Sequence, residues 1–377
     1  MKITILTGPF LCLPPDAIGA IEKRWYLVGK KWISQGDDVT FICKKPMNCK
    51  KQNDYIYIKG YERTGNWFKD FFLDFIYSMK ALKKVSSTDI LVLNSIWSPI
   101  LSRMYKKKFK ISIYNVARFP KHQMGIYHKF GKIDCFCCTS NATYNALLEQ
   151  NSNLQSSSCV IPNFIDTHVF NGKKVRSLSN TPTIVYSGRV HSEKGLDLLM
   201  KAVEKIFKHH NMRLRILIIG AKDKARGGSG EKYVYELEKL APNCEIIWVD
   251  AIYNPKDLAI EIAKGDIFCY PSVAERGETF GVAPLEAMGL GLPVIVSNLE
   301  CFKDFISNGE NGIVFNHRAE NAVDELESQL WKLLTNPELF KKCSFKGMQT
   351  SQHFSVEAIA EKYHKKFEEL LNGKSLS

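Results

Sequence analysis

Two glutamates lie in the stretch GETFGVAPLEAMGLGLPVIVSN, residues 277–298. Glu278 falls in a glycine-rich loop after an apolar, strand-like run, and Glu286 falls within a short helix, with seven residues between the two acids. Carboxylates accept hydrogen bonds from sugar hydroxyls, and the backbone N–H groups around Gly281 and Val282 open a helix, where phosphate binds well. Two acids on two hydroxyl-bearing groups, with phosphate between them, fit a nucleotide sugar. A helix acid favoured by the dipole would explain Glu286, but not the combination.

Two cations follow another strand-like run, in YSGRVHSEKGLDLL, residues 186–199. Arg189 and Lys194 lie between Gly188 and Gly195, in a loop that leads from a predicted strand into a predicted helix. An arginine can bind a diphosphate through two parallel hydrogen bonds, and a lysine adds a compact charge. Both side chains could instead be solvated surface residues, but their position after a strand favours a diphosphate site.

Gly19 opens the first predicted helix, in TGPFLCLPPDAIGAIEK, residues 7–23. A glycine there lets an anion approach the backbone N–H groups and the positive end of the helix dipole, although a packing role fits equally well. The chain contains neither G-x-G-x-x-G nor G-x-x-x-x-G-K-[ST] in this turn. A dinucleotide cofactor and a P-loop ATPase are therefore both disfavoured.

Strand-like apolar runs alternate with helical segments along the whole chain. They cover residues 2–7, 38–43, 55–60, 90–95, 110–116, 133–140 and 159–163, and then 183–188, 214–220, 244–250, 266–272, 293–298 and 311–316. Several are apolar throughout, which is typical of strands buried on both faces of a parallel sheet. The pattern predicts two doubly wound α/β domains, with ligands beyond the carboxyl ends of the strands.

The polar, turn-rich segment VRSLSNTPT separates the two halves of this pattern. We expect one Rossmann-like domain over residues 1–165, an interdomain linker over 166–182 and a second Rossmann-like domain over 183–350. Residues 351–377 are expected to form a helix that returns to the first domain.

The net positive charge of the chain belongs to its first half. Residues 1–165 contain 24 Lys and Arg against 11 Asp and Glu, whereas residues 166–377 contain 28 of each kind. The net charge of +13 therefore belongs to the first half, which suits an anionic membrane, an acidic substrate or a nucleic acid. The chain lacks RNP-like aromatic runs and a helix-turn-helix signal, so we expect no nucleic acid as a partner.

The eleven cysteines are an odd number, and most lie in apolar strand-like runs. Such use is typical of free thiols in a reducing cytosol. CFCC, residues 135–138, has a Cys-x-x-Cys spacing, but no second pair completes a zinc site, so we interpret it as a core strand.

Four segments together resemble glycosyltransferase family 4, whose members have the GT-B fold and retain the configuration of the transferred sugar. ETFGVAPLE resembles the family's E-x7-E signature, SGRVHSEKG its donor-phosphate loop, VIPNFIDTHVF (160–170) its interdomain segment, and AMGLGLPVIVSN the run after the second acid. The resemblance implies two Rossmann-like domains facing across a cleft. The first would bind the acceptor, and the second the nucleotide sugar.

The resemblance also implies roles for single residues. Arg189 and Lys194 would neutralise the diphosphate leaving group, and together with Glu278, which faces the transferred sugar, they form the expected catalytic set. Glu286 would hold the donor ribose, and the backbone amides at Phe280 would lie near the sugar and the phosphate. The expected donor-binding residues are Gly19, Gly188, Arg189, Lys194, Glu278, Phe280, Gly281, Val282 and Glu286. No metal and no cofactor is expected.

Many members of that family have a histidine after an early strand of the first domain. The corresponding loop here is YNVARFPKHQMG, residues 114–125, where the histidine follows a proline. Arg118, Lys121, His122 and Gln123 form a polar, cationic cluster at the predicted carboxyl end of a strand. We take this cluster as a candidate site for the acceptor or the donor phosphate, and a basic surface loop is the alternative.

The segment GNWFKDFFLDFIYSMKALKKV, residues 65–85, combines many aromatic side chains with lysines, and RMYKKKFK follows at 103–110. A basic amphipathic helix suits an anionic membrane surface. Because one side of the helix must pack on the sheet, we expect most of the aromatic side chains in the core.

The sequence thus predicts a cytoplasmic hexosyltransferase, associated peripherally with the inner face of the membrane. It would transfer a sugar from a UDP- or GDP-linked donor to a glycan or lipid-linked acceptor, in O-antigen, capsule or similar surface polysaccharide assembly. Two alternatives are a GT-B-fold nucleotide-sugar 2-epimerase, which would isomerise the donor without an acceptor, and a basic nucleic-acid-binding protein.

Overall fold

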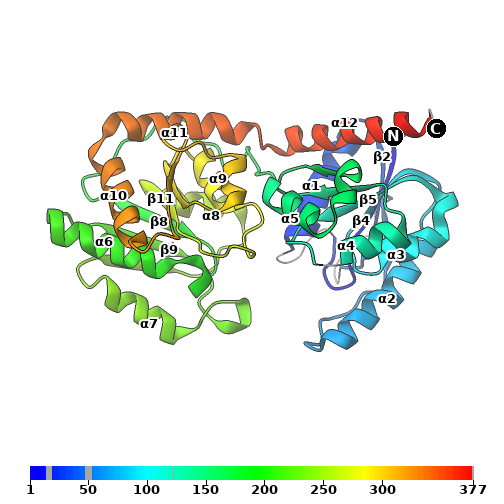
Figure 1. Cartoon of the computed structure of the whole chain (residues 1–377), viewed down its shortest axis with the longest axis horizontal. Coiled ribbons are helices and arrows are strands. Elements are labelled where there is room, and N and C mark those ends of the chain that lie inside the picture. The colour runs from blue at the N-terminus through cyan, green and yellow to red at the C-terminus, as the bar shows by residue number, and fades with distance from the viewer. Residues whose placement is uncertain (14–18, 47–52, 122, 376–377) are drawn as a thin grey trace. The chain divides into compact units, whose positions relative to one another are not determined.

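The computed structural model describes residues 1–13, 19–46, 53–121 and 123–375. The chain folds into two compact units (Figure 1). Unit 1 consists of Met1–Phe164 together with Val356–Ser377, and unit 2 consists of Ile165–Ser355. Each unit is built on a parallel sheet whose strands are connected by helices. The prediction of two doubly wound α/β domains is therefore confirmed.

Within the described residues, seven parallel strands form the sheet of unit 1, in the order β3-β2-β1-β4-β5-β6-β7. They are β1 (Lys2–Leu6), β2 (Asp38–Lys44), β3 (Tyr55–Ile58), β4 (Thr88–Leu93), β5 (Phe109–Val116), β6 (Cys135–Cys138) and β7 (Ser158–Val160). Successive residues of a strand point to opposite faces. Ile3 and Ile5 of β1 accordingly lie in one hydrophobic layer and Leu6 in another, which explains the continuous apolar runs.

Helices and short helical turns connect these strands. They are α1 (Ala20–Ser34), α2 (Trp67–Lys83), α3 (Ser98–Leu101), η1 (Ser102–Lys108), α4 (Gln123–Ile126), η2 (Tyr127–Gly131), α5 (Asn141–Gln150), η3 (Ser152–Ser157) and the C-terminal α12 (Val356–Ser375). In Figure 1, the C-terminal helix α12 runs beside α1, which comes from the N-terminal part of the chain. The ring centroids of Trp25 and Tyr363 are 5.2 Å apart, and those of Trp32 and Phe367 are 5.4 Å apart. The C-terminal helix therefore completes the core of unit 1.

Six parallel strands form the sheet of unit 2, in the order β10-β9-β8-β11-β12-β13. They are β8 (Thr183–Ser187), β9 (Arg215–Ile219), β10 (Glu245–Val249), β11 (Ile267–Tyr270), β12 (Val294–Ser297) and β13 (Ile313–Phe315). The connections are η4 (Ser192–Lys194), α6 (Leu196–His210), η5 (Lys224–Arg226), α7 (Glu231–Leu240), α8 (Pro255–Ile262), α9 (Val282–Gly289), η6 (Glu300–Asp304), α10 (Ala322–Thr335) and α11 (Pro337–Gln352).

The segment 166–182, which the sequence predicts as a linker, belongs to unit 2 in the structure. The guanidinium of Arg176 donates hydrogen bonds to the carbonyls of Ala263 at 2.8 Å and Gly265 at 2.9 Å. The hydroxyl of Ser179 donates to the carboxylate of Asp266 at 2.8 Å. These bonds hold the polar segment on unit 2, because they satisfy backbone carbonyls at the end of α8 and a carboxylate before β11.

The charge asymmetry follows the two units. Unit 1 carries 28 Lys and Arg against 15 Asp and Glu, and unit 2 carries 24 of each kind. Of the helices that the structure describes, none has both the length and the apolar character needed to cross a membrane.

Candidate active site

The chain order of unit 2 reverses between β8 and β11, because β9 and β10 extend the sheet on one side and β12 and β13 on the other. In open α/β sheets, ligands bind at such a reversal, beyond the carboxyl ends of the strands. The loop after β8, residues 188–195, and the loop after β11, residues 271–281, leave the sheet at this point. The N–H of Val273 donates to the carbonyl of Glu193 at 2.9 Å, which joins the two loops.

The two loops bring Lys194 and Glu278 together, although they are 84 residues apart in the chain. Lys194 Nζ lies 2.7 Å from Glu278 Oε2, and the two side chains are only 7% and 13% exposed. The hydroxyl of Tyr270 donates to the same carboxylate oxygen at 3.0 Å. Burial, and then the negative charge of Glu278, raise the pKa of Tyr270 well above its usual value. The tyrosine therefore stays protonated and remains a donor to Glu278.

Arg189 lies in the loop after β8, with its side chain 48% exposed. Its guanidinium is held by Glu193, 2.7 Å from Nη2, and by the carbonyl of Gly227, 3.1 Å from Nη1. The hydroxyl of Tyr186 donates to the carbonyl of Arg189 at 2.8 Å. The ring of Tyr186 stacks on that of Tyr270 with centroids 5.5 Å apart. Two buried tyrosines therefore support both loops of the site, and the sequence analysis did not identify either.

Two glycines allow these loops to take their positions. Gly195 has a φ of +65°, and a Cβ atom there would overlap the carbonyl oxygen of Pro271 in the other loop. Gly281 has a φ of +86°, and a Cβ atom there would overlap the ring of Phe302. Gly281 is also the N-cap of α9. Side chains at either position would therefore force apart the segments that form the site.

The remaining expected donor-binding residues lie around α9. Phe280 is 1% exposed and packs against Phe305, so that its side chain anchors the loop and only its backbone can meet a ligand. Val282 is half-buried at the first position of α9, and Glu286 is half-buried further along the same helix. The structure thus places Glu278 before the helix and Glu286 within it. Their roles toward a ligand stay predictions.

A second charged cluster lies at the same edge of the sheet, and the sequence analysis missed it. Glu275, in the loop after β11, receives two hydrogen bonds of 2.7 Å from Arg318 and one of 2.9 Å from His317 Nε2. Arg318, and then His317, hold the pKa of Glu275 below its usual value. Both partners follow β13, in FNHRA, so the carboxyl end of the last strand was the signal that could have pointed to them. The cluster ties the loop after β11 to the loop after β13.

We expect Glu275→Gln to destabilise unit 2 by roughly 0.5–1 kcal/mol at neutral pH, since the pair is about half exposed to solvent. The pKa of Glu275 is below the ordinary 4.5 in the folded protein. The stabilisation of the folded state by this carboxylate is therefore fully present above the unfolded-state pKa. That contribution is lost as the pH falls through the folded-state pKa. The melting-temperature difference between wild type and variant should therefore shrink as the pH is lowered below 4.5. A difference that stays constant over this range would exclude the ion pair as its cause.

In unit 1, Gly19 is the N-cap of α1 and has an extended backbone. Glu22, in the first turn of α1, is 7% exposed. Burial raises the pKa of Glu22, while the positive charges of Arg63 and Arg118 act in the opposite sense. An acid therefore lies in the helix turn where the sequence predicts an anionic ligand. Its raised pKa favours the neutral carboxyl, which weakens the repulsion. Donor binding at Gly19 stays a prediction.

Three of the four acceptor candidates lie near the carboxyl end of β5. Arg118 and Lys121 are exposed in the following loop and Gln123 is half-buried at the start of α4, whereas His122 lies outside the described residues. The sequence analysis missed Asn115 of β5, which is 5% exposed. Neither its side-chain nitrogen nor its side-chain oxygen has a partner among the residues that the structure describes. A buried amide is rarely left unpaired, so a ligand hydroxyl would suit it.

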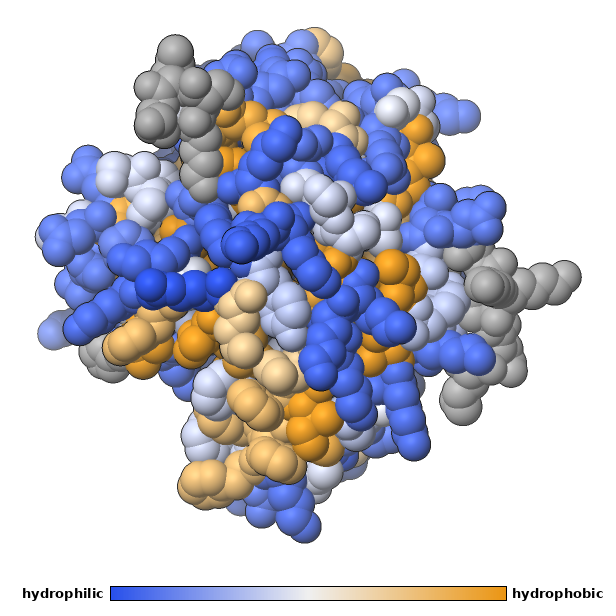
Figure 2. All heavy atoms as spheres, turned by 90° about the vertical axis from the view of Figure 1, so that its right-hand side faces the viewer, coloured by the Kyte–Doolittle hydropathy of each residue, from blue (hydrophilic) through white to orange (hydrophobic). Residues whose placement is uncertain are grey.

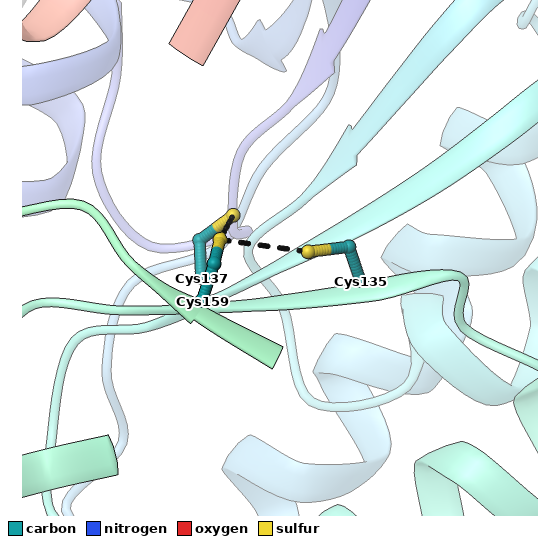
Figure 3. Close-up of side chains that lie close together, drawn as sticks. All are labelled: Cys135, Cys137 and Cys159. Carbon is teal, nitrogen blue, oxygen red and sulfur yellow. Dashed lines mark hydrogen bonds between the residues drawn. The ribbon is translucent and has the colours of Figure 1, made fainter. Parts of the chain in front are cut away.

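Three thiols lie together in the sheet of unit 1 (Figure 3). The Sγ atom of Cys159 on β7 is 3.6 Å from those of Cys135 and Cys137 on β6. The strand CFCC is buried, as the sequence predicts, and Cys159 joins it because it pairs in register with Cys137. All three Sγ atoms lie within 4.8 Å of one another, near enough to hold one soft metal ion. They belong to the core of unit 1, whereas the loops of the candidate active site belong to unit 2.

Residues 170–350, just under half of the chain, match the family model described as glycosyl transferases group 1. The matched range lies within unit 2 and includes both loops of the candidate active site. An uncharacterized glycosyltransferase of Haemophilus influenzae is 29% identical to this chain over 193 residues, which are 50% of this chain and 50% of that protein. The chain thus spans about half the length of this curated relative.

Solved structures match nearly the whole chain. Sucrose-phosphate synthase from Thermosynechococcus elongatus has a TM-score of 0.74 at 18% identity, covering 99% of this chain and 100% of that one. HepE of Anabaena, solved with UDP and glucose, has a TM-score of 0.68 at 15% identity, covering 98% and 100%. At these identities the likeness shows the fold alone. The fold class is α/β, with two Rossmann-like domains of the GT-B type, as the sequence predicts.

Proposed function

We propose that the protein is a glycosyltransferase that moves a hexose-type sugar from a UDP- or GDP-linked donor to a glycan or lipid-linked acceptor. The observation that carries this proposal is the buried contact of Lys194 and Glu278 at the reversal of chain order in unit 2. It brings together one cation, which would bind phosphate, and one acid, which would accept hydrogen bonds from sugar hydroxyls. The match of unit 2 to glycosyl transferases group 1 supports the same reaction class.

In the proposed reaction, the bond between the anomeric carbon and the diphosphate breaks, and a bond to the acceptor hydroxyl forms. The nucleoside diphosphate and the hydroxyl proton leave. Negative charge grows on the diphosphate, and Arg189 and Lys194 stabilise it together with the N–H groups at the start of α9. The configuration at the anomeric carbon is retained on this proposal, and the reaction needs no metal and no cofactor because these groups supply the positive charge.

Glu278 is proposed to hold the transferred sugar. Its hydrogen bonds within the described residues go through Oε2, which leaves Oε1 for a sugar hydroxyl. When Lys194 turns toward phosphate, the hydroxyl of Tyr270 still donates to the carboxylate and keeps it in place. Glu286, on the next helix, is proposed to hold the ribose. This arrangement gives the sugar and the ribose separate acids, with the diphosphate between them.

The acceptor is proposed to bind at unit 1, around Arg118, Lys121, Gln123 and the buried amide of Asn115. The net charge of unit 1 favours an anionic, lipid-linked acceptor over a neutral soluble one. We therefore place the reaction on the cytoplasmic face of a membrane, in the assembly of a surface polysaccharide such as O-antigen or capsule.

A thermal-shift panel of UDP- and GDP-linked sugars tests the donor site. A ligand that binds only the folded protein stabilises it by about 2.7 kcal/mol at a hundred times its dissociation constant. The true donor should therefore raise the melting temperature by roughly 5–10 °C. Arg189→Ala and Glu286→Ala should each abolish most of this shift, and Lys232→Ala, on the exposed side of α7, should leave it unchanged. An undiminished shift in both site variants would remove the assignment.

A further inference from the structure

Helix α2 has two apolar sides, and only one of them faces the core. Asp74, Tyr77, Ser78, Ala81 and Leu82 form its buried side. Trp67, Phe68 and Phe72 are nevertheless 63%, 76% and 61% exposed. The expectation that most aromatic side chains of this segment lie in the core is therefore wrong for the N-terminal half of the helix. Two adjacent turns of the helix present large aromatic rings to solvent, which soluble proteins rarely do without a binding role.

The exposed rings are held in place. The side chain of Asn66 accepts hydrogen bonds from the N–H groups of Phe68 and Lys69, which caps the helix. Trp67 stacks on Phe71 with centroids 5.1 Å apart, and Phe71 lies 4.9 Å from Trp97. This aromatic ladder continues from the tip of α2 into the body of unit 1. The N-terminal turns of α2 are therefore held in a defined conformation by the cap and by ring packing.

Lysines border the exposed rings. Lys69, Lys80 and Lys83 are exposed, and at about 100° per residue they fall on the same side of α2 as Phe68 and Phe72, with Lys80 and Lys83 further along the helix. Trp67 is exposed because it lies in the first turn, although its direction is that of the buried side. The two acids of the helix form hydrogen bonds with other segments of unit 1. Asp70 accepts hydrogen bonds from Thr64, and the buried Asp74 accepts one from the N–H of Trp97. The side of α2 that carries Phe68 and Phe72 thus combines apolar rings with positive charge alone.

The surface continues beyond α2. Met104 of η1 and Phe130 of η2 are 68% and 52% exposed, and Arg103 and Lys129 lie next to them in the chain. Arg103 donates to the carbonyl of Phe130, which brings the two turns together. Figure 2 shows this side of unit 1, where apolar atoms gather in the lower part of the view and hydrophilic atoms surround them. An apolar patch with a cationic border matches the chemistry of an anionic lipid surface.

We propose that Trp67, Phe68 and Phe72, bordered by Lys69, Lys80 and Lys83, form a membrane-docking surface, here called the α2 surface. The rings insert at the boundary between headgroups and acyl chains, where amphipathic aromatic side chains are favoured, and the lysines contact anionic headgroups. A second copy of this chain is disfavoured as the occupant, because two units of net charge +13 would repel each other. The inference specifies the membrane association proposed above and is independent of sugar transfer.

Vesicle flotation without any sugar donor tests the α2 surface. The full chain should bind vesicles of phosphatidylglycerol and phosphatidylcholine, and should bind pure phosphatidylcholine far more weakly. Phe68→Ser with Phe72→Ser should lower the partition coefficient by about tenfold or more, because the apolar area is lost. Lys69→Gln, Lys80→Gln and Lys83→Gln together should lower it by roughly a hundredfold at low salt.

Two controls separate docking from misfolding. Ile260 and Phe345 of unit 2 are 64% and 46% exposed, and their replacement by serine should leave vesicle binding unchanged. Vesicles should also shift the tryptophan emission to shorter wavelength. Trp67→Phe should remove most of that shift, because Trp67 is 63% exposed, whereas Trp25 and Trp32 are fully buried and Trp97, Trp248 and Trp331 are half-buried. A folded Phe68→Ser/Phe72→Ser variant that binds like wild type overturns the proposal. The proposal is also overturned if the wild-type chain forms a dimer and does not bind vesicles, while the same variant is a monomer. Either failure leaves the proposed transferase reaction intact.

Discussion

Lys194→Met is expected to reduce sugar transfer by roughly a thousandfold, because it removes one of two cations that stabilise charge on the leaving diphosphate. The same change should destabilise unit 2 by about 3–5 kcal/mol, since it leaves the carboxylate of Glu278 buried without its ion-pair partner. Release of nucleoside diphosphate and urea-induced unfolding measure the two effects separately. The stability loss follows from the structure alone, whereas the rate loss depends on the proposed reaction.

The double variant Lys194→Met/Glu278→Gln tells these effects apart. Glutamine keeps an acceptor for the hydroxyl of Tyr270 and removes the buried charge, so most of the stability should return while activity stays lost. Lys201→Met is the matched control, because Lys201 pairs with Asp197 in an exposed position at 3.2 Å and should change neither property. A double variant as unstable as the single one would contradict the ion pair. Wild-type turnover in Lys194→Met would contradict the role at the diphosphate.

Gly195→Ala is expected to lower the stability of unit 2 by about 3 kcal/mol or more and to abolish donor binding. The residue has a φ of +65°, which costs an alanine about 1–2 kcal/mol. Its Cβ atom would also overlap the carbonyl oxygen of Pro271, a backbone atom that cannot turn away. The loops after β8 and β11 would therefore separate. Melting temperature and a donor thermal shift measure the two consequences.

Gly309→Ala serves as the control for Gly195→Ala. Gly309 lies in the same unit with a φ of +76°, but a Cβ atom there meets no atom within 4 Å. It should cost only the conformational penalty of about 1–2 kcal/mol and leave donor binding intact. Equal losses in the two variants would show that close approach of the loops is not what requires a glycine at position 195.

The strands were predictable because burial on both faces of a parallel sheet demands long apolar runs. DIFCYPS contains β11 and PVIVSN contains β12, each within a few residues of its observed bounds. The positions of Arg189, Lys194 and Glu278 in loops that follow strands were predictable for a related reason, and such loops carry ligand sites, although the roles of the three residues stay predictions. The order of elements along the chain was therefore enough to place them at the carboxyl ends of strands.

The contacts between loops were not predictable in the same way. Lys194 meets Glu278 only because β8 and β11 are neighbours, and sheet order is a property of the whole unit. The pairing of Glu275 with Arg318 depends likewise on how the loops after β11 and β13 approach each other. In α2, the 3.6-residue pattern marks apolar positions but not which side meets the sheet. The exposure of Phe68 and Phe72 could therefore only be seen in the structure.

Unit 1 is assembled from the two ends of the chain, since α12 supplies Tyr363 and Phe367 to the rings of Trp25 and Trp32. During translation, the ribosome delivers Trp25 more than three hundred residues before its partner. All residues of unit 2 emerge in between, so this unit can fold first, while an incomplete N-terminal sheet must wait with aromatic surface uncovered. Until α12 is synthesised, the rings of Trp25 and Trp32 therefore lack the aromatic partners that pack on them in the folded unit.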